Sequence, residues 1–349
     1  MNNIITQKNM KSTNLNEVLD IVRKNGELTR REILQYSGLS WGGTSQIITQ
    51  LLQKKLVITK ESGGTASGRR PETISLNGND NYVLGIDINL SGIYAVLVNL
   101  KSEIIYQSGI KPEVSERDEL INATEGLISD IREKYKHKNI MAIGISMQGR
   151  VDEKNGISGE LDKINNWKDV PIKDIFEEKF GIPVHIAHDP ECLLTAVASD
   201  DDALLLRLDF GIGMAVKKCG ELISAAGMLE LGKTVCENGM RLDDYATITG
   251  LSQSFGITPE NFDDAKNSAA FDKMASQLGV ALSNAVLIFD VKKVYICGEL
   301  LKYGKCFLNK TESIVKKYCG EDTVIEIFDV KKAAEGAADI AINNKIFVL

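Results

Sequence analysis

The stretch ELGKTVCENGMRLDD, residues 230–244, gathers side chains that could do chemistry within a short distance along the chain. It holds the carboxylates of Glu230, Asp243 and Asp244, the amine of Lys233 and the thiol of Cys236. A structural zinc site needs four donors, usually thiolates and imidazoles. With one thiol and no histidine, the segment predicts no metal site, so its charges must serve another purpose.

The amino-terminal segment contains the elements of a nucleic-acid-binding module. NLNEVLDIVRKNG predicts an amphipathic helix that ends at Gly26. The next segment predicts a short helix from an N-cap at Thr29 to Tyr36, a turn over residues 37–40, and a second helix. The runs LVITK and ETISL, separated by ESGGTASGRRP, predict a hairpin. Together these elements predict a winged helix-turn-helix.

The charge distribution points to a polyanionic partner for this module. Residues 1–77 hold eleven Lys or Arg against six Asp or Glu, a net charge of +5, whereas the remainder carries −12. The second helix of such a module enters the major groove of duplex DNA, where its outward residues reach base edges. The candidates for these base contacts are Trp41, Gly43, Ser45, Gln46 and Thr49. Arg69 and Arg70 are candidates for phosphate or minor-groove contacts.

Two other interpretations of these residues remain open. A winged helical module can serve protein contacts instead of DNA. Arg69 and Arg70 by themselves are equally compatible with a solvated loop tip.

From residue 81 onward, β-type runs alternate with helical patterns, which predicts an α/β body. A hairpin followed by a helix occurs twice, starting near Tyr82 and near Ala203, and predicts two similar lobes facing a cleft. The six cysteines are scattered and predict reduced thiols. The chain has neither a signal-peptide pattern nor an apolar run of membrane-spanning length, so we expect a cytoplasmic protein with no membrane partner.

The order of the motifs GIDINLSGIYAVLVNL, AIGISMQGRVD, HIAHDPECLLTA, LDFGIGMAV, ELGK and VKKVYICGEL after a winged helix-turn-helix resembles the repressor branch of the ROK family of repressors, open reading frames and sugar kinases. The resemblance implies an actin-like or hexokinase-like body of two α/β lobes, a sugar site between them, and assembly into homodimers or homotetramers. The boundaries that follow are 1–78 for the DNA-binding domain, 79–190 for the first lobe with a helix near 332–349 packing back on it, and 191–331 for the second lobe.

Departures from the kinase pattern indicate that nucleotide binding is lost. Asn89 replaces a glycine of the family's first phosphate turn, which removes a close backbone approach. In the family's second phosphate turn, Asp209 and Phe210 put a carboxylate and a ring where phosphate oxygens would lie. Asp189 matches the family's catalytic base and could still accept a proton from a sugar hydroxyl, although His188 precedes it in place of asparagine. Asp189 is equally well explained as a helix N-cap.

The opening segment resembles the family's zinc loop with most ligands replaced. Glu230 fits a sugar-facing glutamate, Lys233 stands at the histidine position, Arg241 at a cysteine position, and Asp243 at the last glutamate, while Cys236 remains. We expect the cations to offset the neighbouring carboxylates in place of a metal. The alternative is a solvated charged surface.

Lys163, Asn165 and Asn166 lie where the family has a loop with a sugar-contacting asparagine. Lys163 and Lys233 would border the pocket and suggest an anionic sugar, unless internal carboxylates satisfy them. The ligand-binding candidates are therefore Lys163, Asn165, Asn166, His188, Asp189, Glu230, Lys233 and Asp243.

The sequence as a whole predicts a sugar-responsive transcriptional repressor that binds operator DNA, with no catalytic activity, metal or cofactor. Two alternatives remain, namely a ROK-type ATP-dependent sugar kinase and a ligand-independent DNA-binding protein with a decayed pocket.

Overall fold

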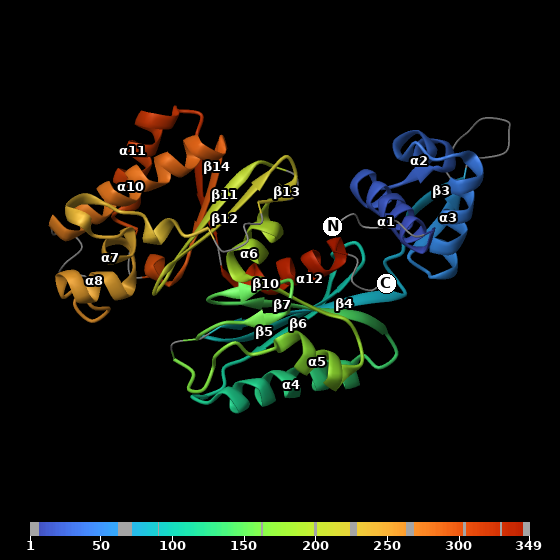
Figure 1. Cartoon of the computed structure of the whole chain (residues 1–349), viewed down its shortest axis with the longest axis horizontal. Helices are drawn as coiled ribbons and strands as arrows, with labels where there is room; N and C mark the ends of the chain where they lie inside the picture. Colours follow the sequence, from blue (N-terminus) through green and yellow to red (C-terminus); the bar gives the residue numbers. More distant parts are fainter. Residues whose placement is uncertain are drawn as a thin grey trace. The chain divides into compact units, whose positions relative to one another are not determined.

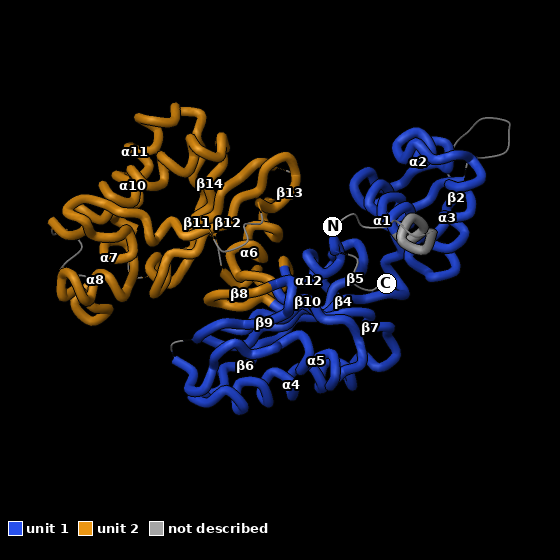
Figure 2. The backbone as a smooth tube through the Cα atoms, in the orientation of Figure 1, with its two compact units in different colours: residues 1–145, 153–186, 337–349 blue, residues 146–152, 187–336 orange. Residues whose placement is uncertain are grey.

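The computed structural model (Figure 1) describes residues 7–61, 72–89, 91–161, 163–198, 201–223, 229–262, 269–302, 305–328 and 330–344. By its internal contacts the chain divides into two compact units, shown in Figure 2. The first contains residues 1–145, 153–186 and 337–349, and the second contains residues 146–152 and 187–336. The finer division of the chain into a head and two lobes stays a prediction. We call the described part of residues 7–76 the head, the rest of the first unit the first lobe, and the second unit the second lobe.

The head consists of three helices and a small antiparallel sheet. Its elements are α1 (Gln7–Asn25), β1 (Leu28–Thr29), α2 (Arg30–Ser37), α3 (Trp41–Gln53), β2 (Val57–Glu61) and β3 (Glu72–Leu76), with strand order β1-β3-β2. The predicted apolar face of α1 is buried, with Leu15, Val18, Leu19 and Val22 in the head's core. The helix-turn-helix and the hairpin after it are thus present as the periodicity predicts.

Local capping determines where α2 and α3 begin and end. Thr29 and Glu32 form a capping box at the start of α2, as the N-cap prediction required. Gly38 ends α2 with φ +64°, a left-handed conformation that glycine adopts without strain. Ser40 Oγ then accepts a hydrogen bond from the Gly43 amide at 3.2 Å and caps α3. The two helices are held at a sharp turn by these short-range contacts.

The first lobe contains a mixed five-stranded sheet of order β10-β7-β4-β5-β6. Its antiparallel part is β4 (Asn81–Asn89), β5 (Gly92–Asn99) and β6 (Ile104–Ile110). The strands β7 (Asn139–Met147) and β10 (Val184–His188) complete it, and β8 (Val151–Asp152) pairs with β9 (Ile157–Ser158). In Figure 1, α4 (Arg117–Lys134) and α5 (Ile172–Phe180) lie on one side of this sheet and α12 (Ala333–Asn343) on the other.

The second lobe repeats this design with a sheet of order β13-β12-β11-β14-β15. The strands are β11 (Ala203–Leu208), β12 (Ile212–Lys218), β13 (Glu221–Leu222), β14 (Lys293–Cys297) and β15 (Val324–Ile327). Its helices are α6 (Asp189–Val197), α7 (Leu242–Ala246), α8 (Ile248–Phe255), α10 (Ala269–Phe289) and α11 (Leu308–Cys319). Short 3-10 turns are η1 (Leu231–Lys233), η2 (Glu237–Gly239), η3 (Glu299–Lys302) and η4 (Val330–Lys332). The repeated hairpin-plus-helix order confirms the predicted α/β body of two lobes.

The core of the second lobe lies between its sheet and the α7, α8, α10 and α11 helices. Every residue of β11 is buried, and its even-numbered leucines join this core. Its odd-numbered residues, including Arg207, point to the opposite face. The period-two alternation of β11 therefore puts a charged side chain on the α6 face of the sheet.

In the part of the chain that the structure describes, no helix has the length and apolarity needed to cross a membrane.

Candidate functional site

The α3 helix presents the residues predicted to contact DNA. Its inner face buries Thr44, Ile47, Ile48 and Leu51. Its outer residues Gln46 and Thr49 are exposed, Gly43 and Ser45 are half-buried, and the Trp41 side chain is 58% exposed at the helix start. Trp41 is not part of the head's apolar core cluster. Arg69 and Arg70 lie outside the described residues.

Tyr36, a residue that the sequence analysis did not select, is also exposed on this part of the head. It lies near the end of α2, and its side chain is 58% exposed. A single aromatic residue near the end of a short helix has no distinctive pattern, so the sequence alone gave no reason to choose it.

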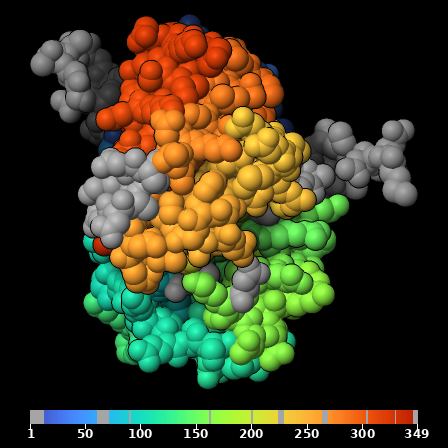
Figure 3. Space-filling model, turned by 90° about the vertical axis from the view of Figure 1, so that its left-hand side faces the viewer, coloured from blue at the N-terminus to red at the C-terminus, as the bar shows by residue number. Residues whose placement is uncertain are grey.

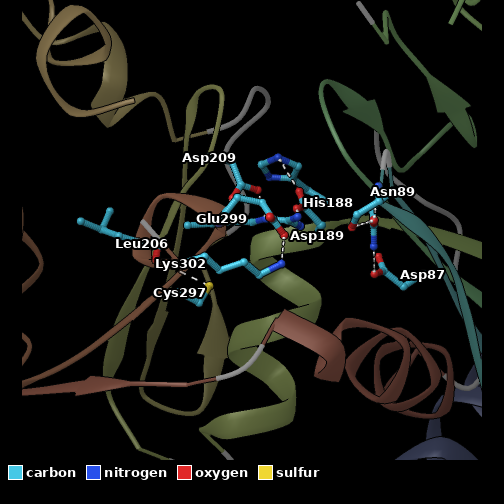
Figure 4. Close-up of polar contacts among 11 residues, drawn as sticks. Asp87, Asn89, His188, Asp189, Leu206, Asp209, Cys297, Glu299 and Lys302 are labelled. Carbon is cyan, nitrogen blue, oxygen red and sulfur yellow. Dashed lines mark hydrogen bonds and ion pairs between the residues drawn. The ribbon is translucent and has the colours of Figure 1, made fainter. Parts of the chain in front are cut away.

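Asp189 lies at the first turn of α6 within a buried charge cluster of the second lobe (Figure 4). Its Oδ2 accepts a hydrogen bond from Arg207 Nη1 on β11. Arg207 Nε also donates to Asp209 Oδ2 at 2.6 Å, so one guanidinium holds two carboxylates. Asp209 Oδ1 in turn accepts the Glu299 amide. Asp189 is 4% exposed and Arg207 is 5% exposed, so both charges are removed from bulk water.

Burial and charge act in opposite directions on Asp189. Burial raises the pKa of this carboxyl to about 6, while the Arg207 guanidinium lowers it and Asp209 raises it. His188 Nε2 lies 3.4 Å from Asp189 Oδ1. The N-cap of α6 is His188, so the interpretation of Asp189 as the N-cap is wrong. Asp189 is instead a buried carboxylate that can change its protonation state near neutral pH.

The orientation of the Asp209 carboxylate differs from the one expected from the sequence. We expected its carboxylate to repel a phosphate, but it is turned inward, is 8% exposed, and both oxygens are bound within the lobe. The adjacent Phe210 side chain is 44% exposed at the loop between β11 and β12. The loop between β11 and β12 therefore differs from the kinase pattern by an internal ion pair and a protruding ring, and not by a free negative charge.

The turn after β4 is closed by the side chain of Asn89 (Figure 4). Its Nδ2 donates to Asp87 Oδ2 at 2.6 Å, and its Oδ1 accepts the Ser91 amide at 2.9 Å. A glycine at this position would leave that amide available to an anion. The Asn89 side chain occupies it instead.

The segment of residues 230–244 is held together by charge and by close packing. Lys233 Nζ contacts Glu230 Oε1 at 2.7 Å, with the two side chains 57% and 36% exposed. The Ile212 amide donates to Asp243 Oδ1 at 3.2 Å. Asp243 packs directly on Gly232, where a Cβ atom would overlap its carboxylate. Burial raises the pKa of Asp243.

These contacts confirm only part of the expected charge compensation. Lys233 does neutralise Glu230, whereas Arg241 contributes its backbone amide to Asp244 Oδ2 at 2.7 Å. Among the described residues, no ion pair of the Arg241 guanidinium is found, and no group of three or more His, Cys, Asp or Glu is placed to hold a metal ion.

The start of β12 connects the two groups of the second lobe. Asp243 binds the Ile212 amide, and Pro190, the residue after Asp189, packs on Gly213. Gly213 is also paired in register with Arg207. The second lobe thus brings Asp189 and His188 to the same strand end as Asp243, Glu230 and Lys233.

The remaining candidates lie in the first lobe, where the two asparagines share one partner. Asn165 Nδ2 and Asn166 Nδ2 donate to the two carboxylate oxygens of Glu116 at 2.8 and 3.0 Å. Glu116 precedes α4 and was missed by the sequence analysis, because it is far from the asparagines along the chain. Lys163 is exposed in the same loop.

Comparisons with known proteins agree with this architecture. The xylose repressor of Caldicellulosiruptor bescii is 24% identical to this chain, with 88% of each protein covered. A crystal structure of a ROK family transcriptional regulator, a homolog of the E. coli Mlc protein, matches 97% of both chains with a TM-score of 0.78 at 18% identity. A ROK hexokinase from Thermus thermophilus matches 74% of this chain and 96% of its own, with a TM-score of 0.63 at 20% identity. The ROK family model matches residues 83–344, and the chain therefore belongs to the ROK family.

Proposed function

We propose that this protein is a sugar-responsive transcriptional repressor. The observation that carries the proposal is the combination of an exposed, capped α3 helix in the head with a body whose first phosphate turn is closed by the Asn89 side chain and whose second carries the internal Arg207–Asp209 ion pair. Relatives named as repressors extend over both the head and the body, in support of the same function. The head would bind an operator half-site through α3, and the body would bind the effector.

The charges of the second lobe favour a neutral sugar as effector. Asp189, Asp209, Glu230 and Asp243 outnumber the cations Arg207 and Lys233. An anionic ligand would meet net negative charge there. Carboxylates are good partners for sugar hydroxyls.

We propose that the protein does not catalyse phosphoryl transfer. Asp189, at the position of the kinase base, is buried and its carboxylate is already bound to Arg207 within the lobe. Asn89 occupies the amide of the first phosphate turn with its own side chain. A bound carboxylate without a site for the phosphoryl donor serves ligand binding only.

We also propose a homodimer, because two heads are needed to read two half-sites. The outer face of α10 is a suitable interface. No residue from Met274 to Phe289 is charged, and Val280, Leu287 and Ile288 are 47%, 57% and 75% exposed at helical spacing. Figure 3 views the second lobe from the side on which α10 and α11, in orange and red, lie at the surface.

The function is tested by fluorescence anisotropy with labelled duplexes from the region upstream of the protein's own gene. We expect salt-sensitive, sequence-selective binding that changes when one of a panel of neutral sugars is added. A parallel assay with ATP, magnesium and the same sugars should show no turnover. Sugar phosphorylation that is abolished by Asp189→Asn would establish the kinase alternative instead.

A further inference from the structure

A hollow of about 550 Å³ lies on the first lobe at the carboxyl end of α4. Its lining includes the three cations Arg132, Lys136 and Lys138 and the single carboxylate of Glu133. They belong to the run IREKYKHKN, which has four Lys or Arg against one Glu in a body that carries a net charge of −12 outside the first 77 residues. The hollow is therefore a local basic site on an acidic body.

The cations of this hollow form few strong ion pairs with carboxylates of the protein. Lys136 pairs with Glu133 at 2.8 Å, but both side chains are at least 73% exposed, so the pair contributes little. Arg132 donates to the Phe180 carbonyl at 2.9 Å, and Lys138 donates to the Tyr82 hydroxyl at 2.7 Å. Among the described residues, neither Arg132 nor Lys138 forms an ion pair with a carboxylate. Their charge remains available to an anion.

Hydrogen bonds place the hollow at the end of the first lobe to which the head is attached. Asn139, a lining residue, donates to Asn81 Oδ1 at 2.8 Å, and Asn81 Nδ2 donates to the Lys55 carbonyl of the head at 2.8 Å. Tyr82, which binds Lys138, donates to the Asn79 carbonyl in the connecting segment at 2.7 Å. The basic hollow is thus two hydrogen bonds away from the backbone of the DNA-binding module.

We propose that this hollow binds the phosphate backbone of the DNA that flanks the operator half-site. The inference rests on DNA binding by the head. It follows because an acidic body next to a polyanion costs free energy unless cations face the duplex where the two come closest. Cations at a helix carboxyl end also complement the helix dipole, but that effect is confined to the last turn. Lys136 and Lys138 lie beyond α4.

The test compares two duplexes in the full-length protein. One contains only the operator, and the other extends it by about one helical turn, roughly 10 base pairs, at each end. The variant that removes charge from the hollow, called the groove variant below, is Lys136→Gln/Lys138→Gln. The control variant is Lys111→Gln/Lys154→Gln, which removes the same charge from two exposed lysines of the first lobe outside the hollow.

We expect the wild type to bind the longer duplex about tenfold more tightly. The slope of the logarithm of its binding constant against the logarithm of the salt concentration should also be steeper, by about 0.9 for each additional phosphate contact. The groove variant should lose this gain and keep its affinity for the short duplex, while the control variant keeps both. Lys136→Arg/Lys138→Arg should retain the gain, which separates the charge effect from misfolding.

Equal binding of the two duplexes by the wild type, or an undiminished length effect in the groove variant, would overturn the inference. Failure of the protein to bind either duplex would instead refute the function proposed for the head. If inorganic phosphate at millimolar concentration protects the folded protein through Lys136 and Lys138 without any effect of duplex length, the hollow binds a small anion and the DNA assignment is wrong.

Discussion

Asp189 is the residue whose protonation should control effector binding. Its pKa of about 6 means that the carboxylate is mostly ionised at pH 7.5 and mostly protonated at pH 5. The ionised form accepts hydroxyl hydrogens, so sugar affinity should fall roughly tenfold as the pH decreases from 7.5 to 5, with a midpoint near 6. Calorimetric titration across this range measures the effect. Asp189→Asn should bind weakly and without this midpoint, and a wild-type affinity that is constant with pH would contradict the prediction.

The same shift predicts how stability depends on pH. The pKa is raised from 3.8 in the unfolded chain to about 6 in the folded protein, so the folded state holds this proton more tightly. The resulting stabilisation is present below about pH 4 and is lost as the pH rises through 6. The loss is at most roughly 3 kcal/mol in the free energy of unfolding.

Urea denaturation of wild type and Asp189→Asn at pH 4.5 and 7 measures this difference. The variant should gain stability relative to wild type on going to pH 7, because asparagine does not ionise. A gap that is equal at the two pH values would show that Asp189 does not titrate between them.

Lys233 should matter for ligand response more than for folding. Its pair with Glu230 is largely exposed and contributes at most about 1 kcal/mol to stability. Lys233→Ala removes the ion-pair partner of Glu230 and a cation that acts on Asp243, so we expect a several-fold weaker response to the effector with unchanged operator affinity. Lys316→Ala, which breaks the comparable pair with Glu312 on α11, serves as the control. An unchanged response in Lys233→Ala would mean that the segment is only a charged surface.

At the scale of elements, we expect α3 to carry the sequence selectivity. Gln46 is exposed on the outer face of this capped helix and can form two hydrogen bonds to a base edge. Gln46→Ala should therefore reduce the preference for operator over random DNA by about 1–3 kcal/mol, with little change in random binding. Competition anisotropy with both duplexes measures the ratio. If both affinities fall equally, Gln46 does not read a base.

The elements that sequence reasoning predicted well are those with local causes. The helix-turn-helix follows from caps, a glycine turn and apolar spacing within the head, and the structure shows the Thr29 capping box and the left-handed Gly38. β6 was missed because its residues are mostly exposed and lack strict alternation. Glu116 and Arg207 were missed because their roles depend on contacts made only by the fold. An arginine inside the apolar run LLLRL was the one available signal for a buried ion pair.

At the scale of the whole molecule, assembly should depend on α10. Replacing an exposed aliphatic residue by a carboxylate in a symmetric interface places two like charges close together. Ile288→Glu should therefore shift the protein from dimer to monomer and weaken operator binding by more than tenfold, since one head alone binds one half-site. Sedimentation velocity and anisotropy measure the two effects.

The control for this prediction is Ser313→Glu on the exposed part of α11, which adds the same charge outside the apolar face of α10. A dimer that persists in Ile288→Glu would exclude this face as the interface, whatever the effect on DNA binding.

The head shares its core with the body, because Leu100 after β5 is 2% exposed within the head's apolar cluster and Met141 packs against it. A chimaera that grafts a different head onto this body at residue 78 would leave Leu100 facing water or an ill-fitting surface, at a cost of about 1.5–3 kcal/mol for an aliphatic side chain of this size. To exchange operator specificity between relatives, the head residues that pack around Leu100 must therefore be transferred together with α3.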